Sequence, residues 1–133
     1  MRSPGPRGRF EDWLCRYENA WRTAGVESLG QLFTESATYL PAPFDEPLRG
    51  LGEIAVFWEA ERESADEEFS MSSELLAAEG DVAVVRVEVR YRSPRERVYR
   101  DLWVVTLCAD GRASAFEEWP FFPDRERTAP SAS

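Results

Sequence analysis

Residues 98–121 read VYRDLWVVTLCADGRASAFEEWPF, two apolar segments of alternating pattern on either side of Asp110-Gly111. Asp-Gly supplies the positive φ angles that a two-residue hairpin turn requires. A loop of that length fixes which residues of the two strands stand opposite each other. The predicted opposed pairs are Ala109–Arg112, Val105–Phe116 and Trp103–Glu118.

Side chains of directly opposed residues share one face of a sheet. The predicted register therefore groups four side chains on a single face: Asp101, Trp103, Phe116 and Glu118. Glu118 stands diagonal to Asp101, and diagonal neighbours on a sheet lie about 7–8 Å apart. A slip of one residue would turn the whole set to the other face.

The segments before this hairpin change from a helical to an alternating period. Alternation predicts strands around 69–75 and 83–91, with Gly80 in the hairpin between them. Apolar residues at helical spacing predict helices over 10–24, about 26–33 and 51–58, and 37–40 reads as an extended stretch. Three helices followed by a four-strand antiparallel meander give an α+β fold, in which the helices cover one face of a curved sheet.

This order of elements resembles the nuclear-transport-factor-2-like superfamily, which includes the SnoaL-like domains. The pattern of its ketosteroid-isomerase branch is matched by Arg16-Tyr17, Gln31, Phe33, Ala37-Thr38, Glu46-Pro47 and Gly50. The wider SnoaL-like pattern is matched by Ala20-Trp21, Leu32-Phe33, Pro43-Phe44, Phe57-Trp58, Arg100-Asp101-Leu102-Trp103 and Phe116-Glu117-Glu118-Trp119. The resemblance covers about 9–122 and implies a cystatin-like cone, whose helices close over the sheet around an internal pocket.

The resemblance also implies that the face carrying Asp101 and Glu118 turns toward the helices. The expected pocket is then lined by aromatic side chains, which are Tyr17, Tyr39, Trp58, Tyr91, Trp103 and Phe116. An apolar cavity with a few convergent polar groups is the usual form of a small-molecule site. The alternative is that these rings are simply core.

Two carboxyl groups facing an apolar interior are costly unless they are paired or protonated. They can serve as acid–base or ligand-binding groups. They can instead be structural, with Asp101 accepting hydrogen bonds from Tyr17 or Trp58, and Glu118 from Trp103. Both interpretations remain open at this point.

The known mechanisms of the superfamily each lack a part in this sequence. In the isomerase branch, the tyrosine that donates to the developing enolate falls on Tyr17, but the proton-transferring aspartate falls on Pro41 and the second donor on Trp103. Polyketide cyclases and scytalone-type dehydratases use a pocket histidine, and this sequence contains none. The limonene-epoxide-hydrolase branch needs an arginine between two acids, whereas the strand arginines Arg86, Arg90 and Arg100 lie in the phase opposite the pocket.

The charge of the chain argues against two classes of partner. The net charge is −9, from 25 acidic and 16 basic residues. Such a chain is repelled by phosphate backbones and anionic lipid surfaces, so neither nucleic acid nor a membrane is expected as a partner. Neither the residue types nor the resemblance indicates a cofactor or a metal site, so none is expected.

The ends of the chain read as disordered, which divides it into a disordered 1–8, a SnoaL-like domain over 9–124 and a disordered 125–133. No signal peptide or membrane span is expected at the N-terminus. Cys15 and Cys108 lie far apart and outside any CxxC, which suits a cytoplasmic protein, although the sequence leaves a disulfide between them open.

Two functions fit these features. One is an enzyme that isomerises, dehydrates or cyclises a small apolar molecule, with Asp101 or Glu118 as general acid or base and Tyr17 as hydrogen-bond donor. The other is a ligand-binding or dimerisation module that has lost the catalytic residues. In either case a homodimer through the outer face of the sheet is expected, because apolar residues group there: Val82, Val84, Leu102, Val104, Trp119 and Phe121.

Overall fold

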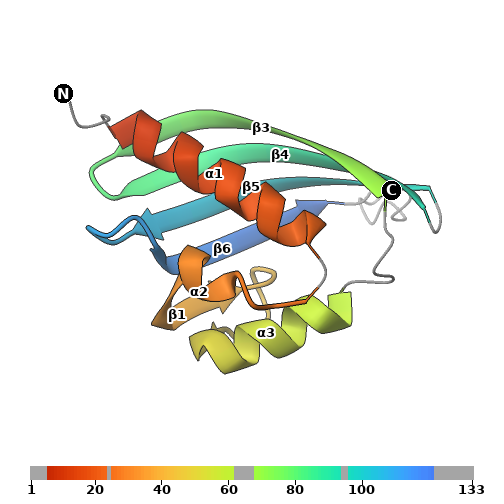
Figure 1. Ribbon diagram of the computed structural model, residues 1–133. Helices are drawn as coiled ribbons and strands as arrows, with labels where there is room; N and C mark the ends of the chain where they lie inside the picture. The colour runs from red at the N-terminus through yellow and green to blue at the C-terminus, as the bar shows by residue number, and fades with distance from the viewer. Residues whose placement is uncertain (1–5, 24, 62–67, 94–95, 122–133) are drawn as a thin grey trace, which may run out of the picture.

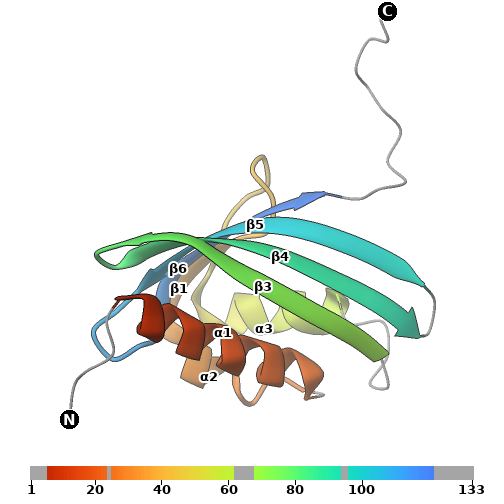
Figure 2. The same ribbon diagram turned by 90° about the horizontal axis from the view of Figure 1, so that it is seen from above.

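In the part of the chain that the structure describes, three helices and a six-stranded sheet are present. The helices lie on the concave side of the curved sheet (Figures 1 and 2). The computed structural model describes residues 6–23, 25–61, 68–93 and 96–121. In chain order the elements are α1 (Pro6–Arg22), α2 (Leu29–Leu32), β1 (Phe33–Leu40), β2 (Leu48–Arg49), α3 (Gly50–Glu61), β3 (Glu68–Glu79), β4 (Val82–Ser93), β5 (Arg97–Leu107) and β6 (Ala113–Phe121). The predicted α+β class is confirmed.

The sheet is larger than the predicted four-strand meander. Its strand order is β2-β1-β6-β5-β4-β3, so β3 to β6 form the expected meander and two further strands extend it. β1 runs parallel to β6, with Tyr39 opposite Phe116, and β2 pairs antiparallel with β1. The extended stretch predicted over 37–40 is therefore part of a strand that begins at Phe33. This strand covers the edge of β6 that a meander alone would leave unpaired.

The hairpin between β5 and β6 confirms the predicted register by a different route. Its loop has three residues: the Cys108 N–H donates to the Arg112 carbonyl (2.8 Å), and the Gly111 N–H donates to the Cys108 carbonyl (2.9 Å). Gly111 takes the left-handed conformation, with φ of 88°. A bulge then leaves Ser114 unopposed, because Leu107 pairs with Ala113 but Thr106 pairs with Ala115.

The extra loop residue and the bulge offset each other. The pairs Trp103–Glu118 and Val105–Phe116 are therefore as predicted, whereas the pair Ala109–Arg112 is wrong. The face of the sheet that carries Asp101 and Trp103 is the one the helices cover, since both side chains are buried.

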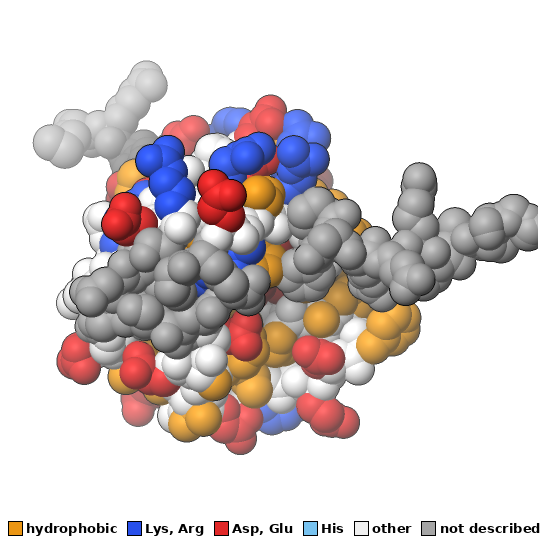
Figure 3. All heavy atoms as spheres, turned by 90° about the vertical axis from the view of Figure 1, so that its right-hand side faces the viewer, with side chains coloured by type: hydrophobic (Ala, Val, Ile, Leu, Met, Phe, Trp, Pro, Cys, Tyr) orange, Lys and Arg blue, Asp and Glu red, His pale blue; other side chains and the backbone are white. Residues whose placement is uncertain are grey.

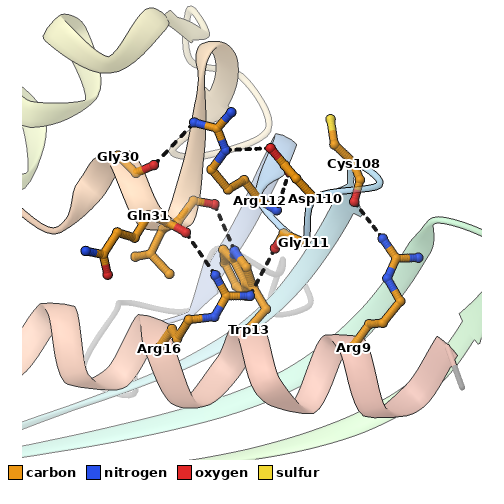
Figure 4. A network of polar contacts seen from close by, with 10 residues as sticks. Arg9, Trp13, Arg16, Gly30, Gln31, Cys108, Asp110, Gly111 and Arg112 are labelled. Atoms are coloured by element: carbon orange, nitrogen blue, oxygen red, sulfur yellow. Dashed lines mark hydrogen bonds and ion pairs between the residues drawn. The ribbon is translucent and has the colours of Figure 1, made fainter. Parts of the chain in front are cut away.

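Arginine side chains tie this hairpin to the helices (Figure 4). Arg16 on α1 donates to the carbonyls of Gln31 (2.9 Å) and Gly111 (3.0 Å), and so joins α1, α2 and the hairpin. Arg9 donates to the Cys108 carbonyl at 2.6 Å, and Arg112 to the Gly30 carbonyl at 3.4 Å. These contacts fix the position of β6 relative to α1, and hence that of Glu118 relative to Tyr17.

Trp13 is at the centre of the aromatic core between α1 and the sheet. Its ring lies 5.5 Å from that of Tyr17 and 5.7 Å from that of Phe116, measured between centroids. Its indole N–H donates to the Leu32 carbonyl at 3.0 Å, so the polar atom of this fully buried ring is satisfied. The core therefore holds α1, α2 and β6 together directly beneath the site.

Part of the predicted disordered N-terminus is helical, and the two cysteines do not form a disulfide. Residues 6–8 belong to α1, which begins earlier than the predicted helix; the rest of the predicted disordered ends, 1–5 and 125–133, lies outside the described residues. Cys15 and Cys108 are both described and both free, and Cys15 is exposed. Within the described part of the chain, no helix is long and apolar enough to span a membrane.

Candidate functional site

A cavity of about 170 Å³ lies between α1, α3 and the inner face of the sheet. Most of its wall is aromatic or apolar, with three acids and one arginine among them. The lining residues are Tyr17, Trp21, Tyr39, Pro41, Phe57, Trp58, Glu61, Met71, Val89, Tyr91, Arg97, Tyr99, Asp101, Trp103, Glu118 and Pro120. Its mixture of rings and a few polar groups is typical of a small-molecule site.

The end of the molecule where α1 and α3 finish and β5 begins faces the viewer in Figure 3. Basic side chains gather on the upper part of this end, with some acidic ones, whereas hydrophobic and further acidic side chains lie on the lower part, toward α3. Trp21, Glu61 and Arg97 reach the cavity from these element ends.

The two predicted acids meet inside the cavity, on neighbouring strands. Asp101 is 8% exposed, and its Oδ2 accepts a hydrogen bond from the Trp103 indole at 3.0 Å. Its Oδ1 is buried and receives no hydrogen bond from an N–H group or a hydroxyl of the described residues. Glu118 is half-buried, and its Oε1 accepts a hydrogen bond from the Tyr39 hydroxyl at 2.8 Å.

These donors differ from the ones the structural alternative predicted. Trp103 donates to Asp101 and not to Glu118, because Trp103 and Asp101 are two residues apart on β5 and share a face. Trp58 donates to neither acid; its indole nitrogen is buried without a partner within the described ranges. Each acid thus has one N–H or hydroxyl donor, and a hydrogen bond connects the two carboxyl groups.

The pKa of Glu118 is raised well above its usual range. Burial is the largest cause, because it disfavours the charged form. A hydrogen bond with Asp101 and the negative charge of Asp101 raise the pKa further, while the hydrogen bond from Tyr39 opposes the shift. Glu118 is therefore a neutral carboxylic acid at pH values where an exposed glutamate is ionised.

The two tyrosines beside the pair remain protonated. Burial is the largest cause that raises the pKa of both Tyr17 and Tyr39, followed by the negative charge that Glu118 carries once it is ionised. A protonated hydroxyl can donate a hydrogen bond to a substrate oxygen or to a carboxylate. The inner end of the cavity thus combines two hydroxyl donors, a neutral acid and a second carboxyl group.

Most of the predicted site residues line this cavity: Tyr17, Tyr39, Trp58, Tyr91, Trp103, Asp101 and Glu118. Phe116 is the exception, since it is not among the described residues that form the wall. It is 2% exposed and packs behind the wall, with its ring 4.7 Å from that of Tyr39 and 5.0 Å from that of Trp103. Phe116 comes two residues before Glu118 on β6, and there the strand lies outside the cavity wall.

Several lining residues were missed by the sequence analysis, notably Arg97 and Tyr99. The alternation on β5 could have found them, since 97 and 99 are in phase with 101 and 103. The Arg97 guanidinium lies 3.8 Å from the centre of the Tyr91 ring and donates to the Tyr99 hydroxyl at 3.2 Å. Arg86, Arg90 and Arg100 are exposed on the outer face, as predicted, where they pair with Glu74 and Glu88.

Pro41 and Trp103 both reach the cavity, so the family positions carried over from the isomerase branch do converge there. Neither side chain can transfer a proton. Within the ranges that the structure describes, no group of three or more His, Cys, Asp or Glu side chains is placed to hold a metal ion.

Comparison with known proteins agrees with the fold. Residues 15–116 match the family described as SnoaL-like domain. No curated protein matches the chain. Among solved structures, it is similar to a protein named as a SnoaL-like polyketide cyclase from Jannaschia sp. CCS1, with a TM-score of 0.70 and 16% identity over 90% of both chains.

Two further structures have the same fold. An epoxide hydrolase of Mycobacterium tuberculosis has a TM-score of 0.68 and 12% identity, over 89% of this chain and 86% of that one. A ketosteroid-isomerase-like protein from Catenulispora acidiphila, in complex with trimethylamine, has a TM-score of 0.62 and 13% identity, over 80% and 83%. At these identities the likeness shows the fold and not the chemistry.

Proposed function

Because the chain belongs to the SnoaL-like domain family, we propose that it takes a small, mostly apolar molecule into this cavity and catalyses an acid–base reaction on it. The observation that carries the proposal is the contact between Glu118, which retains its proton, and Asp101 inside an aromatic wall. Two carboxyl groups whose surroundings separate their protonation states can act as acid and base in one reaction. Isomerisation, dehydration and cyclisation need no more than this.

Each polar group has a distinct part in the proposed reaction. Asp101, as the carboxylate of the pair, would accept a proton from a C–H next to a carbonyl or a leaving group. Glu118 would return a proton to the substrate, and Tyr17 would donate a hydrogen bond to the oxygen on which negative charge develops. Tyr39 would hold the Glu118 carboxyl in place through the bond at 2.8 Å.

The second candidate is a binding module without chemistry. Pro41 supports it, because this residue lies in the cavity at the position where the isomerase branch has its proton-transferring aspartate. The neighbour from C. acidiphila, which holds trimethylamine, supports a small-molecule pocket under either function. The two candidates differ in whether the acid pair moves a proton.

The protonation of Glu118 tests the proposal without a known substrate. In carboxyl-carbon NMR between pH 3 and 8, one glutamate signal is expected to titrate well above the usual glutamate pKa, and this signal should disappear in Glu118→Gln. Glu117→Gln, one residue away on the outer face, is the matched control and should leave the signal in place. If all glutamate signals titrate near the exposed value, the acid pair does not exist, and the binding module is the better account.

The outer face of the sheet is proposed to pair with a second copy of the chain. Val82, Leu102, Trp119 and Phe121 are between 37% and 55% exposed there, and ion pairs of Glu88 with Arg90 and Arg100 flank them. A patch of this kind is most often covered by two-fold pairing with itself. The hydrogen bonds of the two cavity acids, Tyr39 to Glu118 and Trp103 to Asp101, are formed within one copy of the chain.

Sedimentation at micromolar concentration is expected to give about twice the chain mass of 15.2 kDa. Leu102→Glu puts a charge into the patch and should yield monomers. Val56→Glu, at a residue on α3 that is 72% exposed, is the control and should remain dimeric. A parent protein that stays monomeric at high concentration would refute this pairing.

A further inference from the structure

The cavity carries more negative than positive groups. Glu61, Asp101 and Glu118 line it. Because Glu118 keeps its proton, the negative charges are those of Asp101 and Glu61, against Arg97 alone among the described basic residues that line the cavity. The charge of Glu61 acts on Glu118, since it contributes to the raised pKa of Glu118, and burial raises the pKa of Glu61 itself. An anionic ligand would therefore be repelled, and a neutral ligand would leave these charges uncompensated.

Asp101 gives a second and independent indication. Its carboxyl group is nine-tenths buried at the cavity wall, and its Oδ1 receives no hydrogen bond from an N–H group or a hydroxyl in the described part of the chain. The hydrogen bond with the neutral Glu118 brings no positive charge to it. A buried carboxylate oxygen in that state is costly. A positive charge in the cavity would lower this cost by direct electrostatic attraction.

The wall itself suits a positive charge. The rings of Tyr17, Trp21 and Trp58 lie close together in it, with Tyr17 and Trp58 centroids 5.3 Å apart and Trp21 and Trp58 centroids 4.8 Å apart. The faces of aromatic rings attract cations, and Trp does so most strongly. Arg97 already uses this attraction at the outer end, where its guanidinium lies 3.8 Å from the centre of the Tyr91 ring.

We infer that the cavity binds a small organic cation, namely a quaternary or protonated amine with apolar substituents. The inference rests on the proposed function only in that the cavity takes a ligand; the positive charge of that ligand is new. Rings would surround the apolar substituents, and the carboxylates of Asp101 and Glu61 would compensate the charge. A volume of about 170 Å³ restricts the ligand to a few heavy atoms.

The test uses two probes of the same shape. Choline carries a quaternary nitrogen, and 3,3-dimethylbutan-1-ol has a neutral carbon in its place. Binding is measured by quenching of tryptophan fluorescence, to which Trp21, Trp58 and Trp103 in the wall contribute, and by calorimetry. Choline is expected to bind with a Kd at least about tenfold lower than that of the neutral alcohol.

Variants assign this preference to the cavity. Asp101→Asn keeps the shape but removes a negative charge, so the ratio of the two Kd values should fall toward one. Glu61→Gln should lower it in the same direction and serves if Asp101→Asn does not fold. Glu88→Gln removes a carboxylate from the outer face and should leave the ratio unchanged.

Equal binding of the two probes would overturn the inference while leaving a small-molecule site intact. Binding of neither probe would also overturn it. The proposed acid–base function is decided separately, because it depends on whether Glu118 titrates above its usual range and not on either probe. A ratio lowered equally by Glu88→Gln would show that the preference comes from the overall charge of the chain.

Discussion

As the pH rises, the parent protein is expected to lose stability, and Glu118→Gln is expected to lose less. The folded state keeps the Glu118 proton to a higher pH than the unfolded state does, because burial and Asp101 raise the pKa. Between the usual glutamate pKa and the raised one, the parent should therefore lose about 1.4 kcal/mol of unfolding free energy per pH unit. In Glu118→Gln this slope should be smaller, and the part that remains is that of Glu61, whose pKa is also raised by burial.

Urea unfolding at intervals between pH 5 and 8 measures the slope. Glu88 and Asp110 do not interfere, because bonds to arginine lower the pKa of both carboxyls, and the stability they contribute is lost only as the pH falls below the usual acidic range. Glu74→Gln, on the outer face, is the matched control and should keep the slope of the parent. A parent profile as flat as that of Glu118→Gln would contradict the assignment.

The same substitution bears on catalysis. An amide cannot supply a proton, so once a substrate is known, Glu118→Gln is expected to lower the rate by about two to four orders of magnitude. It keeps an oxygen that can accept the hydrogen bond from Tyr39, so the cavity should keep its shape. Unchanged affinity together with a large loss of rate would separate the enzyme from the binding module.

The meander from β3 to β6 was the most predictable part of the molecule, because strand alternation and a hairpin turn are strong local signals. Strict alternation on β4 and β5 and the Asp110-Gly111 turn were enough to place Asp101 and Glu118 diagonally on the covered face. The loop length was wrong, yet the register was right, because the bulge at Ser114 restored the count. Alternation along the two strands constrains the register more strongly than the turn does.

The bonding within the site could not be predicted in the same way. Which indole or hydroxyl reaches which carboxyl depends on side-chain conformations, and these follow from packing that no local pattern records. Tyr39 reaches Glu118 because β1 lies parallel beside β6, and this pairing connects residues 79 positions apart. The predicted register showed on which face of the sheet Phe116 lies, but not which part of β6 borders the cavity. For that reason Phe116 was assigned to the cavity.

The two neighbours of Glu118 act on it in opposite directions. The negative charge and hydrogen bond of Asp101 raise its pKa, whereas the hydrogen bond from Tyr39 lowers it. Asp101→Asn is therefore expected to lower the pKa of Glu118, since it removes the charge and can offer an amide N–H to the ionised form. Tyr39→Phe is expected to raise it further, because it removes a donor that stabilises the carboxylate. Carboxyl-carbon NMR of the two variants measures both shifts.

A loss of packing common to both variants cannot produce opposite pKa shifts. It would admit water to the cavity and lower the pKa of Glu118 in both. Opposite shifts are specific to a carboxyl group held between a like charge and a donor. Thr38→Val, beside Tyr39 on β1 but directed to the other face, is the control and should leave the titration of Glu118 unchanged. Shifts of the same sign in Asp101→Asn and Tyr39→Phe would mean that burial alone keeps Glu118 neutral, and Asp101 would then have no part in holding its proton.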